Sequence, residues 1–266
     1  MAATDTSTGF GGLLREWRHR RSVSQLELSL DANLSARHLS FVETGRSRPS
    51  REVVVRLAEC LQIPLRERNA LLLAAGYAPI YGERRYDSPE MEPVRDALER
   101  FLRAHEPYPA LVIDRRHNLL SANDALLALT EGCAAHLLDP PANVVRVALH
   151  PEGLAPRTEN LAEWSSHLLA RLRREAAVTR DRELEELYDE VSRYPGVALD
   201  APTPERPAGE IAVPLRLRLD GEVLSFMSTI STFGTAVDVT LSELSIEAFY
   251  PANAQTALLM LRQLEG

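Results

Sequence analysis

The chain has 266 residues, 45% hydrophobic and 26% charged, which is typical of a soluble globular protein with enough apolar residues for more than one core. This composition excludes a disordered, collagen-like or disulfide-stapled protein. No apolar run approaches the roughly eighteen residues that a membrane span needs. The first residues, MAATDTSTGF, lack the features of a signal peptide, so we expect a cytoplasmic protein.

Charge is distributed unevenly along the chain. The net charge is −8, yet residues 1–82 contain 11 Arg against 8 acidic residues, a net charge of +3, and the remainder carries −11. A basic amino-terminal segment joined to an acidic body is an asymmetry that the function has to explain.

Five short runs with apolar residues at helical spacing lie between Phe10 and Gly76. Ser24 and Glu27 form a predicted capping box at the start of the second helix, and Ser35 is the predicted N-cap of the third. Only two or three residues separate these two helices, which indicates a helix-turn-helix. We therefore expect residues 1–79 to form an all-α five-helix bundle.

The rest of the chain has a different pattern. Residues 80–93 are polar, contain two prolines and read as a linker. Residues 110–123 predict two short strands around a turn, and residues 215–230 predict a hairpin with Asp220-Gly221 at its turn. Helices and a proline-rich loop at 195–214 are expected around these strands. Residues 94–266 are therefore predicted to form an α+β domain with an antiparallel sheet.

Residues 24–50, SQLELSLDANLSARHLSFVETGRSRPS, are similar to the DNA-binding unit of the xenobiotic-response-element, or lambda-repressor-like, transcription regulators. The similarity spans about residues 14–75. Ser29 stands where this family usually has Ala at the helix crossing, and Asn33 stands where it usually has Gly in the turn. The resemblance implies a regulator that binds double-stranded operator DNA, with Arg18 and Glu43 as an internal ion pair. Because one short helix-turn-helix offers too little contact area for specific affinity, we expect a homodimer on DNA.

The outward side of the third helix is the predicted reading surface, once Leu39 and Val42 are assigned to the core. Arg37 can donate two hydrogen bonds to guanine, and apolar side chains there can contact a thymine methyl group. The family resemblance implies a phosphate contact for Gln25. Two loop arginines are either phosphate contacts or solvated charges, and Phe41 could also fold onto the bundle. The predicted DNA-binding residues are Gln25, Ser35, Ala36, Arg37, His38, Ser40, Phe41, Arg46 and Arg48.

The carboxy-terminal region resembles the MmyB-like ligand-binding domain of such regulators. The resemblance rests on PALVIDRRHNLLSAN, EWSSHLLARLRREA and TFGTAVDVTLSELSIEAFYPAN. It implies a PAS-like fold and a small apolar ligand such as a fatty acid, and no cofactor is expected. A curved sheet under helices leaves an apolar cavity, in which Arg171 or His167 would anchor a carboxylate. The alternative is that these residues are plain core or solvated helix surface. The predicted ligand-binding residues are Leu126, Trp164, His167, Leu168, Arg171, Phe226 and Phe233.

Two other functions compete with a ligand-controlled regulator. One is a constitutive DNA-binding regulator whose second domain only dimerises. The other is an enzyme fused to a DNA-binding head, because Cys133 and His136 lie three residues apart on a predicted helix, as two metal ligands or a thiol–base pair would. No second Cys/His pair has matching spacing, so we expect neither a metal site nor catalysis.

Overall fold

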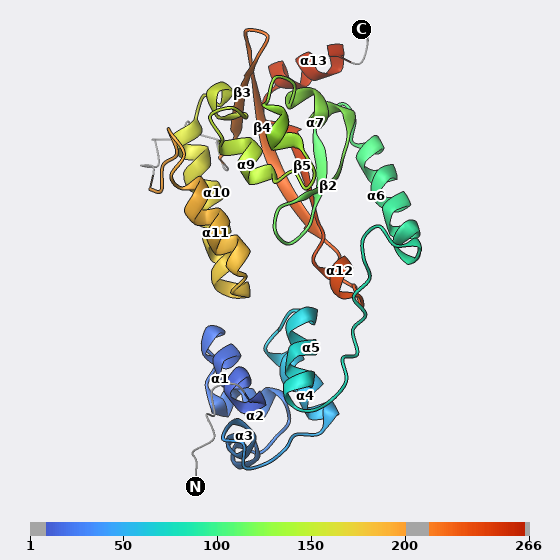
Figure 1. Ribbon diagram of the computed structural model, residues 1–266, viewed down its shortest axis with the longest axis vertical. Coiled ribbons are helices and arrows are strands. Elements are labelled where there is room, and N and C mark those ends of the chain that lie inside the picture. Colours follow the sequence, from blue (N-terminus) through green and yellow to red (C-terminus); the bar gives the residue numbers. More distant parts are fainter. Residues whose placement is uncertain (1–8, 201–212, 264–266) are drawn as a thin grey trace. The chain divides into compact units, whose positions relative to one another are not determined.

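The computed structural model describes residues 9–200 and 213–263, which form two units (Figure 1). The first unit contains the chain up to Tyr86 together with Gly234–Ser242. The second contains Asp87–Phe233 and the chain from Glu243 onward. The expected independent domains, 1–79 and 94–266 with a linker at 80–93, stay a prediction, and most of the expected proline-rich loop lies outside the described residues.

The first unit contains the five expected helices, so the prediction of an all-α bundle is confirmed. The second, third and fourth helices each begin at a serine, Ser24, Ser35 and Ser50, whose hydroxyl accepts a hydrogen bond from a backbone N–H of the first turn. One buried core joins all five, with Leu14 and Leu39 fully inaccessible to solvent. The helices are α1 (Phe10–Arg20), α2 (Gln25–Asp31), α3 (Ala36–Glu43), α4 (Arg51–Cys60) and α5 (Leu65–Ala74).

A late segment of the chain, Gly234–Ser242, also packs in the first unit. Its short helix α12 (Val239–Ser242) contacts α5, and the Val239 side chain is fully buried. The Val239 N–H donates to the Gly82 carbonyl at 2.7 Å, and Asp238 accepts from Arg84 at 2.8 Å. The first unit is therefore completed by residues that follow it by some 150 positions.

The second unit is built on one antiparallel sheet with strand order β2-β1-β5-β4-β3, so the predicted α+β fold is confirmed. The first two strands and the β3–β4 hairpin are the predicted ones. Asp220 and Gly221 both adopt positive φ at the hairpin turn, the geometry that a two-residue loop requires. The strands are β1 (Ala110–Ile113), β2 (Leu119–Ala122), β3 (Leu215–Leu219), β4 (Glu222–Thr232) and β5 (Ser245–Pro251).

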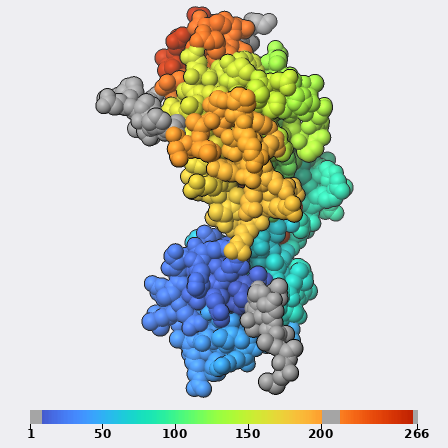
Figure 2. Space-filling view, turned by 60° about the vertical axis from the view of Figure 1, so that its left-hand side comes forward, coloured from blue at the N-terminus to red at the C-terminus, as the bar shows by residue number. Residues whose placement is uncertain are grey.

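Helices pack on this sheet and form a core with it that includes Leu111, Trp164, Leu187 and Phe226. The helix pair α10–α11 makes a continuous surface on one side of this unit (Figure 2). Among the described residues, no helix is long and apolar enough to cross a membrane. The helices are α6 (Glu92–Ala104), α7 (Asp124–Leu129), α8 (Ala135–Leu138), α9 (Val144–Leu149), α10 (Leu161–Thr179), α11 (Arg182–Val191) and α13 (Ala254–Gln263), with single 3₁₀ turns at Pro89–Met91 and Ala155–Arg157.

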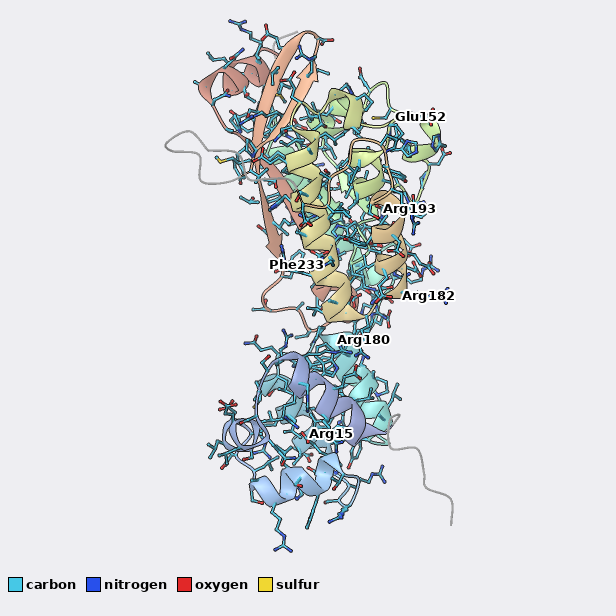
Figure 3. All side chains as sticks on the ribbon, turned by 90° about the vertical axis from the view of Figure 1, so that its left-hand side faces the viewer. Arg15, Glu152, Arg180, Arg182, Arg193 and Phe233 are labelled. Carbon is cyan, nitrogen blue, oxygen red and sulfur yellow. The ribbon has the colours of Figure 1, made fainter. Side chains whose placement is uncertain are left out.

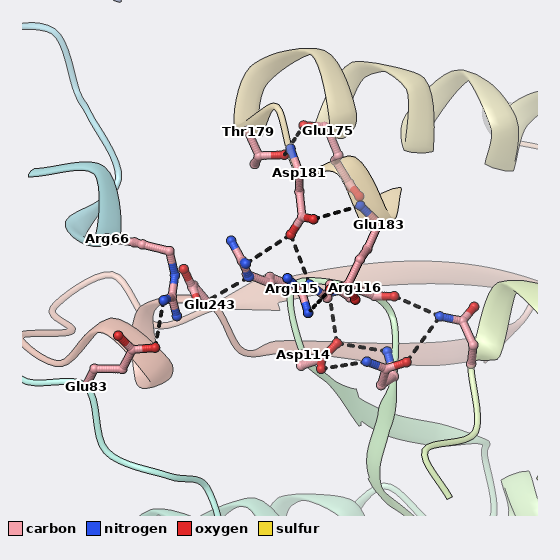
Figure 4. A network of polar contacts seen from close by, with 12 residues as sticks. Arg66, Glu83, Asp114, Arg115, Arg116, Glu175, Thr179, Asp181, Glu183 and Glu243 are labelled. Carbon is pink, nitrogen blue, oxygen red and sulfur yellow. Dashed lines mark hydrogen bonds and ion pairs between the residues drawn. The ribbon is translucent and has the colours of Figure 1, made fainter. Parts of the chain in front are cut away.

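An arginine–carboxylate cluster ties the α10–α11 pair to the sheet (Figure 4). Arg180 takes a left-handed conformation that ends α10, and Asp181 then caps α11 by accepting from the Glu183 N–H at 3.0 Å. The Asp181 carboxylate also binds Arg115 and Arg116 of the β1–β2 turn, each at 3.0 Å. One buried side chain thus fixes two helices against two strands.

Candidate DNA interface and ligand cavity

The two helices of the motif are set by a tight turn between α2 and α3. Asn33 takes a left-handed conformation with φ of 49°, as expected from its short polar side chain. Ser35 then accepts a hydrogen bond from the His38 N–H at 3.1 Å and starts α3. Leu39 and Val42 of α3 are buried in the core, as predicted. The orientation of α3 is therefore fixed by its inward side chains.

The opposite side of α3 is open to solvent. Ser35, Ala36 and Arg37 are exposed, whereas His38, Ser40 and Phe41 are half-buried. The Arg37 guanidinium lies 5.3 Å from the centre of the Phe41 ring, and Phe41 is not among the side chains packed on the core. The outward side of α3 thus presents one cation and one aromatic ring side by side, a combination that suits the edges of bases.

The end of α3 is anchored by a buried carboxylate. Glu43 binds Arg18 of α1 through two hydrogen bonds, Nε to Oε1 at 2.7 Å and Nη2 to Oε2 at 3.1 Å. The predicted internal ion pair is therefore confirmed. The Gln25 side chain donates to the same carboxylate at 3.0 Å, so it lies within this network. Gly11 makes the approach of α1 possible, because a Cβ there would lie 2.4 Å from the Glu43 carbonyl oxygen.

The two loop arginines after α3 differ in their contacts. Arg46 is exposed directly after Gly45, whose φ of 72° turns the chain away from the helix. Arg48 instead donates to the carbonyls of Ala75 and Gly76, at 3.0 and 3.2 Å, and its guanidinium stacks on Tyr77. Arg48 therefore holds the end of α5, where backbone carbonyls collect negative partial charge.

The second unit contains an apolar cavity of about 200 Å³ between one sheet face and helices α7 to α10. Four of the predicted ligand residues line it: Leu126, Trp164, Leu168 and Arg171. Leu138 of α8 also lines it and remains partly exposed. The short helix α9, which was not predicted from the sequence, supplies much of the wall. The helix predicted to carry Cys133 and His136 is the four-residue α8, which begins two residues after Cys133 and so contains only His136 of the two.

The polar end of the cavity is formed by Arg171 and Glu247. The Arg171 side chain is 14% exposed and lies 3.5 Å from the Glu247 carboxylate and 3.7 Å from that of Glu175. Burial alone would raise the pKa of Glu175. The hydrogen bond from His117 at 2.6 Å and the nearby charges of His117, Arg171 and Arg174 together outweigh this effect and lower that pKa. The carboxylate of Glu175 therefore stays charged beside Arg171.

Three predicted ligand residues lie outside this cavity. His167 is exposed on α10, and Phe226 is fully buried against Phe249. Phe233 follows the end of β4 (Figure 3). Glu247 was not predicted from the sequence, although the two-residue period of β5 places it on the same sheet face as Phe249, which also lines the cavity.

The residues of the competing enzyme and metal hypotheses have other neighbours. The Cys133 sulfur lies 3.4 Å from an Arg157 guanidinium nitrogen, while the His136 ring packs edge-on against His150. Within the described residues, His136, His150 and Glu152 have ligand atoms within 4.8 Å of one another and are the grouping that could hold a metal ion. His136 and Glu152 are exposed, so water competes with any such ion.

Two protein-family models match the chain. The model of the MmyB-like transcription regulator ligand binding domain matches residues 94–264, and a model of a helix-turn-helix domain matches residues 10–71. No curated protein matches the chain.

Two solved structures are among those similar to parts of the chain. The clp gene regulator ClgR from Corynebacterium glutamicum is 22% identical, covers 40% of this chain and 99% of its own, and has a TM-score of 0.24. An RNA-binding light-oxygen-voltage receptor is 14% identical, covers 100% of this chain and 68% of its own, and has a TM-score of 0.31.

Proposed function

The chain belongs to the family of MmyB-like transcription regulators, with an amino-terminal helix-turn-helix, and on this premise we propose that it reads operator DNA through α3 under the control of a small apolar ligand. The observation that carries the DNA-binding part is the exposed α3 surface, which is held in place by buried Leu39 and Val42. We propose that this activity takes place in the cytoplasm.

Arg37 and Arg46 are proposed to have different tasks. Arg37 reads a guanine, so Arg37→Ala should relax base preference at one operator position and cost about 1–3 kcal/mol of binding. Arg46 touches phosphate, so Arg46→Ala should weaken binding to all sequences alike and reduce the salt slope by about 1. A randomised-site selection with both variants measures this, and equal effects of the two would refute the division of tasks.

The DNA-bound form is proposed to be a homodimer on an inverted repeat. A single recognition helix offers too little contact area for specific affinity, so two copies would enter successive major grooves about 34 Å apart. A nuclease footprint on the selected operator should cover two half-sites. Protection of a single half-site would argue for a monomer.

The ligand is proposed to be a small apolar molecule with a fatty-acid-like hydrocarbon chain, because apolar side chains line most of the cavity. Leu126→Trp should fill the cavity and abolish binding of such compounds, whereas Leu199→Trp, at an exposed position of the same unit, should not. Because a ligand that binds only the folded state stabilises it, such compounds should raise the melting temperature of the wild-type protein.

Control by the ligand requires a route from the cavity to the DNA-binding unit. β5, which contributes Glu247 and Phe249 to the cavity, follows α12 in the chain after two residues. A ligand that displaces β5 would thus bias α12, with a coupling of about 1–3 kcal/mol. A constitutive regulator is the alternative, and operator affinity that stays unchanged at saturating ligand would favour it.

A further inference from the structure

The two carboxylates at the polar end of the cavity are paired unequally. The single guanidinium of Arg171 faces two carboxylates, Glu247 at 3.5 Å and Glu175 at 3.7 Å. His117 donates a hydrogen bond to Glu175 but leaves that carboxylate charged. Glu175 is thus stabilised by His117 and Arg174 as well as by Arg171, whereas Glu247, within the described residues, has Arg171 alone beside it.

The Glu247 carboxylate can accept more hydrogen bonds than it does. Its side chain is only 6% exposed, and its 3.5 Å separation from Arg171 is longer than the 2.7–3.2 Å of a normal N–H···O hydrogen bond. Within the described part of the chain, Arg171 is the partner of this carboxylate. A carboxylate offers about four acceptor positions, so a buried one with a single long contact favours a hydrogen-bond donor in the adjoining space.

We propose that Glu247 makes the cavity select an apolar ligand whose polar end is a neutral hydrogen-bonding group, a hydroxyl or a primary amide. The same side chain discriminates against a ligand that ends in a carboxylate. This inference rests on the proposed ligand-binding function. The ligand group would donate to Glu247 and accept from Arg171, and so bridge the gap between them. A ligand carboxylate would instead place a second negative charge beside Glu247 in an environment that screens charges poorly.

The size of the cavity determines suitable probes. At about 200 Å³ it is smaller than the usual 300–1,000 Å³ of a drug-sized ligand site. A single medium-length chain is therefore a better match than a branched or polycyclic compound. Octan-1-ol, octanamide and octanoate share one chain and differ only in the polar end.

The test is calorimetric titration of the full-length protein with these three compounds at pH 7, where octanoate is ionised. We expect octan-1-ol and octanamide to bind at least about tenfold more tightly than octanoate, because only octanoate is repelled by Glu247. Octanoate binding as tightly as the alcohol would overturn the inference and leave the ligand-binding function intact. If none of the three binds, the proposed ligand function fails and this inference fails with it.

The variant Glu247→Gln assigns the selectivity to one side chain. Removing the negative charge frees Arg171 for a carboxylate, so octanoate affinity should rise about tenfold while octan-1-ol affinity falls. Glu185→Gln, at an exposed position of α11, is the matched control and should retain the wild-type order. An unchanged order in a Glu247→Gln variant that melts cooperatively would overturn the assignment to Glu247. The wild-type titrations decide the inference even if that variant does not fold.

Discussion

At the scale of single residues, the arginines of the first unit have different roles according to their burial. Arg18 is 12% exposed and neutralises Glu43, which is almost fully buried. Arg37 is exposed on α3 and has no carboxylate partner among the described residues. Arg18 therefore belongs to the scaffold, and Arg37 belongs to the proposed reading surface.

Arg18→Ala should lower the free energy of unfolding by roughly 3 kcal/mol, because it leaves a buried carboxylate without its main partner. Gln25 still donates to Glu43, which keeps the loss at the lower end of the range for buried pairs. Thermal or urea unfolding measures the change, with exposed Arg37→Ala as the control. Equal midpoints for Arg18→Ala and wild type would contradict a structural role.

Arg48→Ala tests a residue for which sequence and geometry suggest different roles. Its hydrogen bonds to the end of α5 indicate a loss of about 1–2 kcal/mol of stability. A phosphate contact would instead lower DNA affinity without changing the melting temperature. Comparison with Arg46→Ala in both measurements separates the two roles, and a normal melting curve for Arg48→Ala would rule out the structural one.

At the scale of elements, the corner between α10 and α11 depends on one carboxylate. Burial alone would raise the pKa of Asp181, but the hydrogen bonds from Arg116 and the Glu183 N–H, with the charge of Arg115, lower it below 3.8. Because the folded-state pKa lies below the unfolded one, the carboxylate stabilises the fold above pH 3.8. This contribution is lost as the pH falls below that value.

Asp181→Asn should therefore cost about 2 kcal/mol at pH 7, and the difference from wild type should shrink as the pH falls below about 4. Urea unfolding at a series of pH values measures it. Asp189→Asn is the control, because Asp189 is an exposed residue on the same helix α11. If the free energy of unfolding of Asp181→Asn stays below that of wild type by a constant amount down to pH 3, the electrostatic explanation is contradicted.

Elements with local signals could be predicted from the sequence, and elements without them could not. Ser24, Ser35 and Asn33 act on backbone groups within a few residues, so the helix-turn-helix was predicted closely. Helix α9 has six residues, too few for a periodic pattern to be recognised. The alternation along β5 places Glu247 and Phe249 on one sheet face. The pairing of β5 with β1 that brings this face to the cavity is a long-range contact that no local pattern reveals.

At the scale of the whole molecule, the boundary between the units is crossed three times by the chain, near residues 86, 233 and 242. The second of the two chain segments that form the first unit is therefore translated long after α5. Val239 is the buried part of that segment, and nearby Val237 is 78% exposed. The two valines form a natural pair for testing whether the segment stabilises the first unit.

Val239→Asp should destabilise the first unit by more than about 3 kcal/mol, because it buries a charge without a partner. Val237→Asp should have little effect. The chain has two tryptophans, Trp17 in the first unit and Trp164 in the second, so a Trp164→Phe background makes fluorescence report on the first unit alone. Identical unfolding midpoints for the two aspartate variants would show that the segment contributes nothing to stability there.

Two separate segments of the chain form the first unit, and this also restricts how the domains of such regulators can be exchanged. Consider a chimera that joins the DNA-binding domain of another regulator to residue 87. It would keep residues 234–242 of this chain, which pack against the α5 that has been replaced. The Val239 side chain would then lose its buried apolar surroundings and face water or a surface that does not fit it. A working graft has to exchange residues 1–86 and 234–242 together, so in this architecture the transplantable module is discontinuous in the gene.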